Sequence, residues 1–373
     1  MESKDLKQMY RTRTEGDFPD AFDFMGRAYE KVEDLRYGTN PHQPAAFYRP
    51  KEGGRLVLGA YQLLKSGKSG LSQTNIEDLH HAAGILKYMP RPACAVMKHC
   101  NPSGVAITPM DGKPFVEVYQ RARDADAQAA FGGVVVANTE IDASTAEEVM
   151  QTVIEAFAAP SFTPEALDTL HDADRFKRNK ELRIIELPSF ANLPKYVGDD
   201  TGVLEAKVFD DGSMVLAKPY LSRIRSVEDM MPAYCDHKSK GRIDIARQPD
   251  ARELDDLLFA WYVNIHVRSN GVVIARNGQT LAVGTGEQDR VGAVQQAIHK
   301  AAVKYKGVES LQGAVMASDG FFPFRDAVDA AVSAGITAIC QPGGSVSDYD
   351  VIAACNETQT AMVFTGERCF SHH

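Results

Sequence analysis

Long apolar runs are missing from this chain, and so is any stretch that resembles a secretory signal. No run approaches the length of a membrane span, and the opening residues, MESKDLKQMYRTRTEGDF, hold no apolar segment of a signal peptide. Cysteine is sparse and lacks CxxC spacing, which is typical of reduced thiols rather than a disulfide framework. The six cysteines are Cys94, Cys100, Cys235, Cys340, Cys355 and Cys369. Together these absences predict a cytoplasmic protein that does not cross a membrane.

An excess of positive charge is also missing. The formal net charge is −9 at pH 7, whereas nucleic-acid-binding surfaces are basic, so we expect no nucleic-acid partner. An anionic small molecule stays open as a ligand, because a local cluster of arginine and lysine outweighs distant, screened charges. The chain has no H-x-E motif with P-C-x-x-C, which excludes a zinc deaminase site, and no other cluster has the spacing of metal ligands.

What the chain has is an ordinary globular composition. Of its 373 residues, 44% are hydrophobic and 24% are charged, which is close to the average of globular domains and allows a sizeable core. The length exceeds that of one small domain, so it favours two domains or lobes.

Helical patterns and buried-strand patterns alternate in two stretches, which favours an α/β fold. Ser144 ahead of Glu147 predicts a capping box at the start of a helix. In the first stretch we expect helices at 28–33, 78–87, 116–127 and 144–157, strands at 93–98 and 134–137, and a turn at 101–104. In the second we expect helices at 253–267, from about 291, at 326–334 and at 347–357, and strands at 271–275, 281–284, 314–317 and 336–340.

Residues 160–250 carry proline, charge and polar clusters, and predict a connecting region with a few strands, including 182–186 and 214–216. The two patterned stretches echo each other weakly, since NPSG (101–104) and QPGG (341–344) both follow a buried strand. This echo suggests an internal duplication.

The pair Lys98–His99 ends a buried strand, and ligands of open α/β sheets bind where strands end. A histidine there can take a proton near neutral pH, and a neighbouring ammonium can stabilise negative charge. The alternative is a surface lysine beside a histidine that caps the turn. Phe131–Gly132–Gly133 would let the backbone approach a ligand closely, or would form a plain turn.

Glycine-rich and aromatic segments in the second stretch add further candidates. Residues 269–271 (SNG) and 284–290 (GTGEQDR) look like a phosphate loop but match neither the P-loop nor the dinucleotide fingerprint. Asn270 either donates to an oxyanion or fixes a turn. SDGFFPFRD (318–326) holds three phenylalanines, which either wall a flat heterocycle or pack under another lobe, and Asp326 is alternatively a helix N-cap. QPGGS (341–345) suits an anion at a helix N-terminus.

Basic residues in turn-rich segments form a candidate positive pocket. They are Arg36, Lys98, Arg290, Arg325 and Arg368. The last of them belongs to the terminal segment RCFSHH, and a terminus decorated in this way is expected to be held in place by a ligand rather than to fray.

In combination these motifs resemble those of a known family. LRYGTNPHQ, KHCNPSGVA, DADAQAAFGG, NGQTLAVGTG, ASDGFFPFRD and RCFSHH occur in the order found in 5-aminoimidazole-4-carboxamide ribonucleotide (AICAR) transformylases. The likeness runs from about Leu35 to the C-terminus. It implies an α/β fold of two related cytidine-deaminase-like lobes without zinc, in a stand-alone form that lacks the IMP cyclohydrolase domain. We expect a lead-in at 1–34, a first lobe with the connecting region at 35–240 and a second lobe at 241–373, with segments exchanged between lobes where the fold requires it.

The resemblance implies formyl transfer from 10-formyltetrahydrofolate, as co-substrate, to the amine of AICAR, with no metal, in a homodimer whose active sites lie at the interface. His99 would be the general base, Lys98 would assist either the tetrahedral intermediate or the leaving folate nitrogen, and Asn270 would orient the formyl group. The implied substrate-binding residues are Arg36, Tyr37, Phe131, Gly132, Arg290, Phe321, Asp326, Arg368 and His372.

Some positions depart from the family pattern. Asp289 stands before Arg290, where the family often has a small hydroxyl residue, and its carboxylate would weaken phosphate binding or pair with Arg290. Ala327 replaces a polar folate contact of some members. His373 lies one residue beyond the usual end, so either His372 or His373 serves the site.

Two other functions compete with this prediction. One is a catalytically inactive nucleotide- or folate-binding protein on the same fold, against which the joint presence of Lys98, His99 and Asn270 argues. The other is an enzyme that uses formate and ATP, against which the lack of a P-loop argues.

Overall fold

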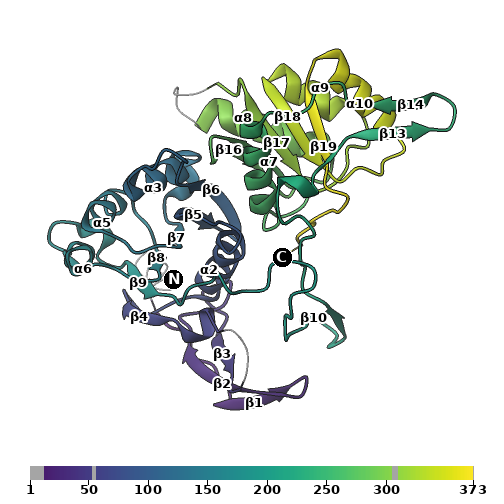
Figure 1. The fold of residues 1–373 in the computed structure, drawn as a ribbon. Helices are drawn as coiled ribbons and strands as arrows, with labels where there is room; N and C mark the ends of the chain where they lie inside the picture. The colour runs from purple at the N-terminus through teal and green to yellow at the C-terminus, as the bar shows by residue number, and fades with distance from the viewer. Residues whose placement is uncertain (1–11, 53–55, 305–309, 373) are drawn as a thin grey trace.

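A single large mixed sheet runs through the molecule. The computed structural model describes residues 12–52, 56–304 and 310–372, and within them the sheet has the strand order β12-β19-β18-β17-β15-β16-β6-β5-β7-β8-β9-β4. Figure 1 shows its two halves side by side, the first in purple to teal and the second in green to yellow. Helices cover both halves, so the α/β class expected from the sequence is confirmed.

The first half consists of a helix, a hairpin and then three strands that alternate with helices. In chain order its elements are β4 (Gln62–Lys65), α2 (Gln73–Leu86), β5 (Ala93–Lys98), β6 (Asn101–Ile107), α3 (Phe115–Asp124), α4 (Ala127–Ala130), β7 (Val134–Ala137), α5 (Ala143–Val149), β8 (Ala156–Ala159), α6 (Pro164–His171) and β9 (Arg183–Glu186). Strand β5 is antiparallel to its two neighbours, β6 and β7. Strands β7, β8 and β9 are parallel to one another, and β4 pairs with β9 as an antiparallel edge strand.

The second half repeats this order. Its elements are β12 (Met231–Pro232), α7 (Ala251–Asn264), β15 (Val272–Arg276), β16 (Gln279–Gly284), α8 (Arg290–Lys304), β17 (Ala314–Ser318), α9 (Asp326–Ser333), β18 (Ile336–Gln341), α10 (Asp348–Glu357) and β19 (Ala361–Phe364). The strand directions repeat as well. Strand β15 is antiparallel to its two neighbours, β16 and β17. Strands β17, β18 and β19 are parallel to one another, and β12 pairs with β19 as an antiparallel edge strand.

The first helix of each half begins with the same device, a capping box. In α2 the side chain of Ser72 accepts from the backbone of Asn75, and in α7 Asp250 accepts from Glu253 in the same way. The same fold is thus built twice along the chain. The turns that suggested a duplication were nevertheless the wrong pair, because NPSG (101–104) lies in strand β6 and aligns with β16 rather than with QPGG.

Alternation along the strands sorts apolar side chains between the two faces of the sheet. Ala95 and Met97 of β5 face the core that α2 and α7 share, whereas Cys94 and Val96 face the core under α3, α5 and α6. A third core lies between the second half of the sheet and α8, α9 and α10. One core therefore spans both halves, and each half keeps another of its own.

Smaller elements lie outside the large sheet. They are the three-stranded sheet β1 (Ala21–Phe24), β2 (Arg27–Asp34) and β3 (Ala46–Pro50), the ribbon β10 (Glu205–Val208) with β11 (Met214–Ala217), the ribbon β13 (Tyr234–His237) with β14 (Gly241–Asp244), and the short 3-10 helices η1 (Leu58–Ala60), η2 (Lys177–Asn179) and η3 (Val227–Asp229). In Figure 1 the β10–β11 ribbon projects away from the body of the molecule.

Besides the turn expected at 101–104, which is part of strand β6, two local predictions are wrong. The helix expected at 28–33 is strand β2, because its mixed polar pattern belongs to a small, half-buried sheet. The helix expected at 144–157 ends at Val149, and strand β8 follows. Its N-cap is Asp142 rather than Ser144: the Asp142 carboxylate accepts from the backbone N–H of Thr145 at 2.8 Å.

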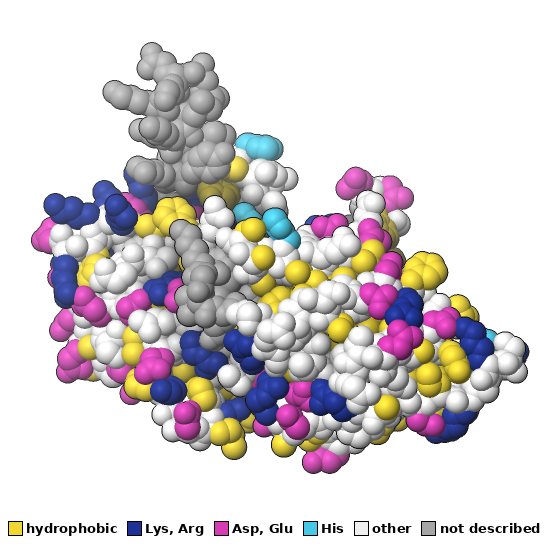
Figure 2. Space-filling view, turned by 90° about the horizontal axis from the view of Figure 1, so that it is seen from above, with side chains coloured by type: hydrophobic (Ala, Val, Ile, Leu, Met, Phe, Trp, Pro, Cys, Tyr) yellow, Lys and Arg dark blue, Asp and Glu magenta, His cyan; other side chains and the backbone are white. Residues whose placement is uncertain are grey.

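Surface and thiol chemistry agree with the composition. Figure 2 shows acidic and basic side chains interspersed over the visible face. The six cysteines, which all lie in described segments, are free thiols. Among the described helices, none combines the length and the apolarity that crossing a bilayer requires. The domain boundaries expected at 34/35 and 240/241 stay a prediction.

Gly104 tests the close approach of α3 to the sheet. A Cβ added there would lie 2.0 Å from the backbone oxygen of Ala122. We expect Gly104→Ala to lower the free energy of unfolding by about 1–3 kcal/mol, because the helix has to move. Gly112→Ala is the control, since its added Cβ meets no atom within 4 Å and only its positive φ adds a cost of about 1 kcal/mol. Chemical denaturation measures both, and equal losses would contradict the account.

Candidate functional site

The tip of the β5–β6 hairpin opens into a polar cavity of about 490 Å³. Four of the residues expected from the sequence line it, namely Tyr37, Lys98, His99 and Gly132. The other lining residues are Thr39, Pro41, Ser72, Thr74, Asn75, Glu77, Asp78, Cys100, Asn101, Glu155 and Arg268. Cations and carboxylates thus face one space, which suits a polar ligand with both donor and acceptor groups.

His99 projects from a two-residue turn. Lys98 pairs with Asn101 across the hairpin, so His99 and Cys100 alone connect the strands, with φ values of 54° and 63°. Positive φ at both central positions is what a tight hairpin turn of this length requires, and it costs an L-residue about 1–2 kcal/mol at each position. The turn leaves the side chain of His99 exposed at the cavity.

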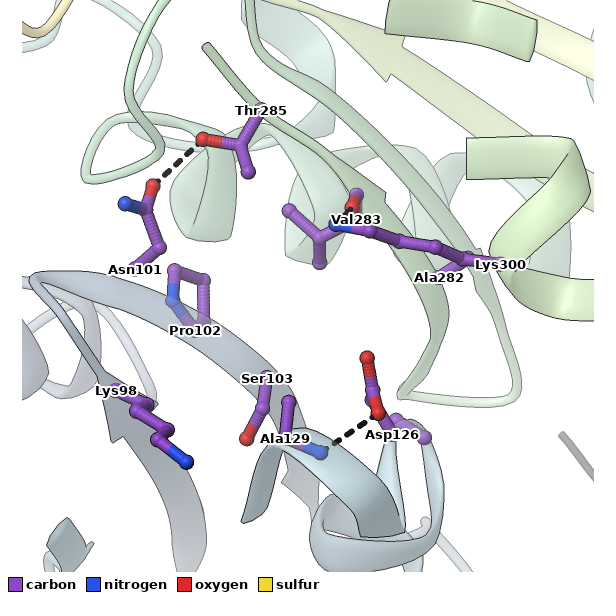
Figure 3. A pocket seen from close by; sticks show the side chains of 11 residues that line it. Lys98, Asn101, Pro102, Ser103, Asp126, Ala129, Ala282, Val283, Thr285 and Lys300 are labelled. Atoms are coloured by element: carbon purple, nitrogen blue, oxygen red, sulfur yellow. Dashed lines mark hydrogen bonds between the residues drawn. The ribbon is translucent and has the colours of Figure 1, made fainter. Parts of the chain in front are cut away.

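Lys98 lies between two cavities. Its ammonium donates to the backbone oxygen of Phe131 at 2.7 Å. A smaller cavity of about 190 Å³ on the other side of Lys98 is lined by residues of both halves of the sheet. Figure 3 shows it, with Lys98 and Ser103 from the first half opposite Lys300 from the second. The amine is therefore fixed by a backbone acceptor and accessible from two sides.

The junction of the two halves is hydrogen-bonded at Asn101. Its Oδ1 accepts from the hydroxyl of Thr285 at 2.7 Å, a bond drawn in Figure 3, and from the backbone N–H of Arg268 at 3.0 Å. Arg268 is exposed and lines the larger cavity. Nothing in the sequence around Arg268 singles it out, because only the pairing of the two halves brings it beside Lys98 and His99.

The sequence analysis did not predict the acidic residues of the larger cavity, such as Glu155. Glu155 accepts from the side chain of Asn75 at 3.0 Å and lies 3.6 Å from the guanidinium of Arg36. Arg36 itself is only 4% exposed and stacks on the ring of Tyr37, with 4.6 Å between guanidinium carbon and ring centre. Arg36 consequently lies behind Tyr37 and is not among the lining residues.

Phe131 and Gly132 follow α4, and only Gly132 lines the larger cavity. The ring of Phe131 is exposed, and the backbone N–H of Gly132 donates to Val153 at 2.7 Å. Gly132 has a φ of 73°, a left-handed backbone that glycine adopts without strain.

A second group of expected residues forms a network in the other half. Nη1 of the Arg290 guanidinium pairs with the buried carboxylate of Asp319, and Nη2 donates to Asn270 Oδ1 at 2.6 Å. Asn270 Nδ2 in turn donates to the backbone oxygen of Glu287 at 2.9 Å. Asp289 does not pair with Arg290: its carboxylate accepts from the backbone N–H of Gly292 at 2.6 Å, at the start of α8.

The terminal segment is held against this network. Ser371 accepts from the backbone N–H of Ser269 at 2.9 Å, and Cys369 donates to the backbone oxygen of Asp319 at 3.1 Å. The guanidinium of Arg368 stacks on the ring of Phe370 at 4.7 Å. These contacts hold residues 369–371 against the rest of the chain, and a ligand that holds the terminus stays a prediction.

Four further expected residues are exposed and, like Arg36, Phe131, Asn270 and Arg290, line neither of the cavities described here. Phe321 is 46% exposed, and Asp326, Arg368 and His372 are exposed as well. Asp326 is the first residue of α9 rather than its N-cap. His373 lies outside the described residues. The expected site therefore divides into a cavity group and a second group, which meet at residues 268–270.

The Arg290–Asp319 pair is buried, since both side chains are at most 5% exposed. Asp319→Asn leaves the guanidinium without a counter-charge, so we expect the free energy of unfolding to fall by about 3–5 kcal/mol. Asp329→Asn, which breaks the exposed pair with Arg325, is the control and should cost far less. Urea denaturation measures both, and similar losses would show that burial of the pair has no consequence.

Fold and site together define a duplicated α/β protein with a Lys–His pair presented at a polar, charged cavity. Residues 4–300 match the AICARFT/IMPCHase bienzyme family, and the chain belongs to this family.

The chain is also similar to two bifunctional purine biosynthesis proteins PurH. The protein of Oceanobacillus iheyensis is 38% identical over 367 residues, which cover 98% of this chain and 64% of the relative. That of Acetivibrio thermocellus is 40% identical over 362 residues, covering 96% of this chain and 62% of the relative. The chain thus spans less than two thirds of the length of either relative.

Proposed function

We propose that this protein is an AICAR formyltransferase. It would transfer the formyl group of 10-formyltetrahydrofolate to the amine of AICAR and give 5-formamidoimidazole-4-carboxamide ribonucleotide, a step of de novo purine biosynthesis. The observation that carries the proposal is the presentation of Lys98 and His99 together at one polar cavity, in a chain of the AICARFT/IMPCHase family. The names of the two relatives support the same biosynthetic role.

The reaction needs a base, because the aminoimidazole lone pair is delocalised towards the carboxamide. In this mechanism the amine nitrogen attacks the formyl carbon while the imidazole of His99 takes the proton from that nitrogen. The ammonium of Lys98 stabilises the oxyanion of the tetrahedral intermediate. The bond between the formyl carbon and N10 then breaks, N10 takes up the proton that His99 had removed from the amine, and tetrahydrofolate leaves.

Asn270 is suited to orient the formyl group. Its Oδ1 accepts from Arg290, which fixes the amide plane, and one N–H of Nδ2 is directed to Glu287. The other N–H is left to donate to the formyl oxygen. Arg290 in this scheme acts on the substrate through Asn270, as its guanidinium is held by Asp319.

Substrate contacts are assigned by position. Tyr37 and Gly132 line the cavity and would contact the nucleotide, with Arg36 stacked behind Tyr37. The exposed rings of Phe131 and Phe321 would contact the flat ring systems. Three further exposed residues would complete the binding of nucleotide and folate, namely Asp326, Arg368 and His372.

The described residues contain no group of three or more His, Cys, Asp or Glu placed to hold a metal ion, and the proposed reaction uses none. We also propose that the two halves are cytidine-deaminase-like lobes divided near residue 240, and that the protein acts in the cytoplasm.

A homodimer with active sites at its interface fits the exposure of the second group. The β10–β11 ribbon gives a further reason. Ala206 faces Leu216 and Val208 faces Met214 across the ribbon, so one face of it is apolar, and all four side chains are exposed. A lone two-stranded ribbon is marginally stable in water. We propose that a second copy of the chain covers this face.

The double variant Val208→Asp/Leu216→Asp tests the dimer. Two charges on the apolar face should shift the protein towards monomer and lower formyl transfer, because the interface would exclude them. Lys207→Glu, on the opposite face of the same ribbon, is the control and should leave the mass unchanged. Sedimentation velocity measures the mass, and a double variant that stays dimeric would show that the copies meet elsewhere.

His99→Ala tests the chemistry. We expect kcat for formyl transfer to fall by about 10²–10⁴-fold, the usual contribution of a general base, with fold and dimer retained. His171→Ala, which removes an exposed histidine at the end of α6, should keep full activity. An absorbance assay with AICAR and 10-formyltetrahydrofolate measures both. Near-wild-type turnover of His99→Ala would overturn the mechanism.

The same assay separates the rival functions. A wild-type protein that binds AICAR but yields no tetrahydrofolate would be an inactive binding protein. Product formed from formate and ATP with the folate omitted would show a different formyl donor.

A further inference from the structure

A buried carboxylate lies beneath the turn that presents His99. Asp78 of α2 is 4% exposed, and its Oδ1 accepts from the backbone N–H of Cys100 at 2.7 Å. The backbone N–H of His99 is near enough to this carboxylate to lower its pKa, although less than that of Cys100 does. One side chain of α2 thus supports the turn from below through the N–H of Cys100.

The second half of the sheet contains the same arrangement. Asp256 of α7 is 2% exposed. Its two carboxylate oxygens accept from the backbone N–H groups of Asn277 at 2.9 Å and Gly278 at 2.8 Å. Asn277 and Gly278 connect β15 to β16 and have φ values of 54° and 66°. In both halves, therefore, an aspartate of the first helix holds a hairpin turn with two positive φ values.

The two turns differ in the residues that occupy them. Asn–Gly is the dipeptide that such turns prefer, because both residues adopt positive φ readily. His–Cys has no such preference, so the first half keeps an unfavourable backbone at this turn. Strained residues of this kind gather at functional sites, where the surrounding structure holds them.

We propose that Asp78 is a positioning residue of the formyl-transfer reaction, which holds the His99–Cys100 turn in its left-handed conformation so that His99 faces the substrate. This inference rests on the proposed function. Asp256 serves only the fold, since no residue of its turn lines a described cavity and Asn–Gly forms the turn unaided.

The ionisation of Asp78 adds a pH dependence. Burial and the nearby carboxylates of Glu155 and Glu77 raise its pKa to about 7, against the lowering effect of the two turn N–H groups. Lys98 and His99 are the basic groups of the hairpin packed against this helix. Below pH 7 the carboxyl takes up a proton and one oxygen no longer accepts freely, so the turn is held less well. Wild-type kcat should then fall more steeply on the acid side than that of Asp78→Asn.

Asp78→Ala removes the acceptor. We expect kcat to fall by about 10–100-fold, the rate equivalent of one lost charged hydrogen bond, with the KM for AICAR changed much less. Asp78→Asn, which keeps one acceptor oxygen, should lose less and serves as the test if Asp78→Ala does not fold. Adding Cys100→Gly to Asp78→Ala should restore most of the activity, because glycine adopts the positive φ without support.

Asp256→Ala is the matched control. It removes the equivalent carboxylate from the equivalent turn, so it should lower the melting temperature while kcat stays unchanged. Hydrogen exchange of the amides of residues 99 and 100 gives a readout that needs no substrate, and Asp78→Ala should exchange faster than wild type there. If the wild type fails to transfer formyl groups, the proposed function falls, and this exchange measurement still decides whether Asp78 holds the turn.

Three results would overturn the proposal. They are a folded Asp78→Ala with kcat within about twofold of wild type, an equal loss in Asp256→Ala, and no recovery in Asp78→Ala/Cys100→Gly.

Discussion

The pairing of β6 with β16 joins the two halves of the large sheet. Its ladder is short, with Gln279 opposite Ala106, and side chains extend it: the hydroxyl of Thr280 accepts from the backbone N–H of Val105 at 2.9 Å. The core shared by α2 and α7 supports the joint from one face. Both cavities around Lys98 lie next to it, so the geometry of the candidate site depends on how the two halves meet.

The repeated fold explains how a chemical site could arise on a structural scaffold. Both halves place an aspartate under a hairpin turn, but only the first carries a histidine there, the proposed proton acceptor. The second half supplies other parts, including Arg268 and Asn270, from the segment that follows α7. One copy of the fold thus holds the proposed reactive pair, and the other forms the wall opposite it.

The sequence predicted much of this fold because strands such as 134–137 are buried, short and flanked by turns, and β7 has those bounds. It failed where local patterns were ambiguous, as in the half-buried strand β2. Of the candidate site, Lys98 and His99 could be predicted from the sequence because they lie at the end of a buried strand. Glu155 and Arg268 were not, since nothing local marks them and only the long-range pairing of strands brings them to the cavity.

The contact between Ser371 and the segment at Arg268 has a practical consequence for handling the protein. An affinity tag or fluorescent label joined directly after His373 would start three residues from the backbone bridge at Ser371, whose other partner, Arg268, lines the candidate cavity. Such an attachment would compete with ligands for the same space. Purification handles and surface-immobilisation linkers are therefore better placed at the opposite end of the chain.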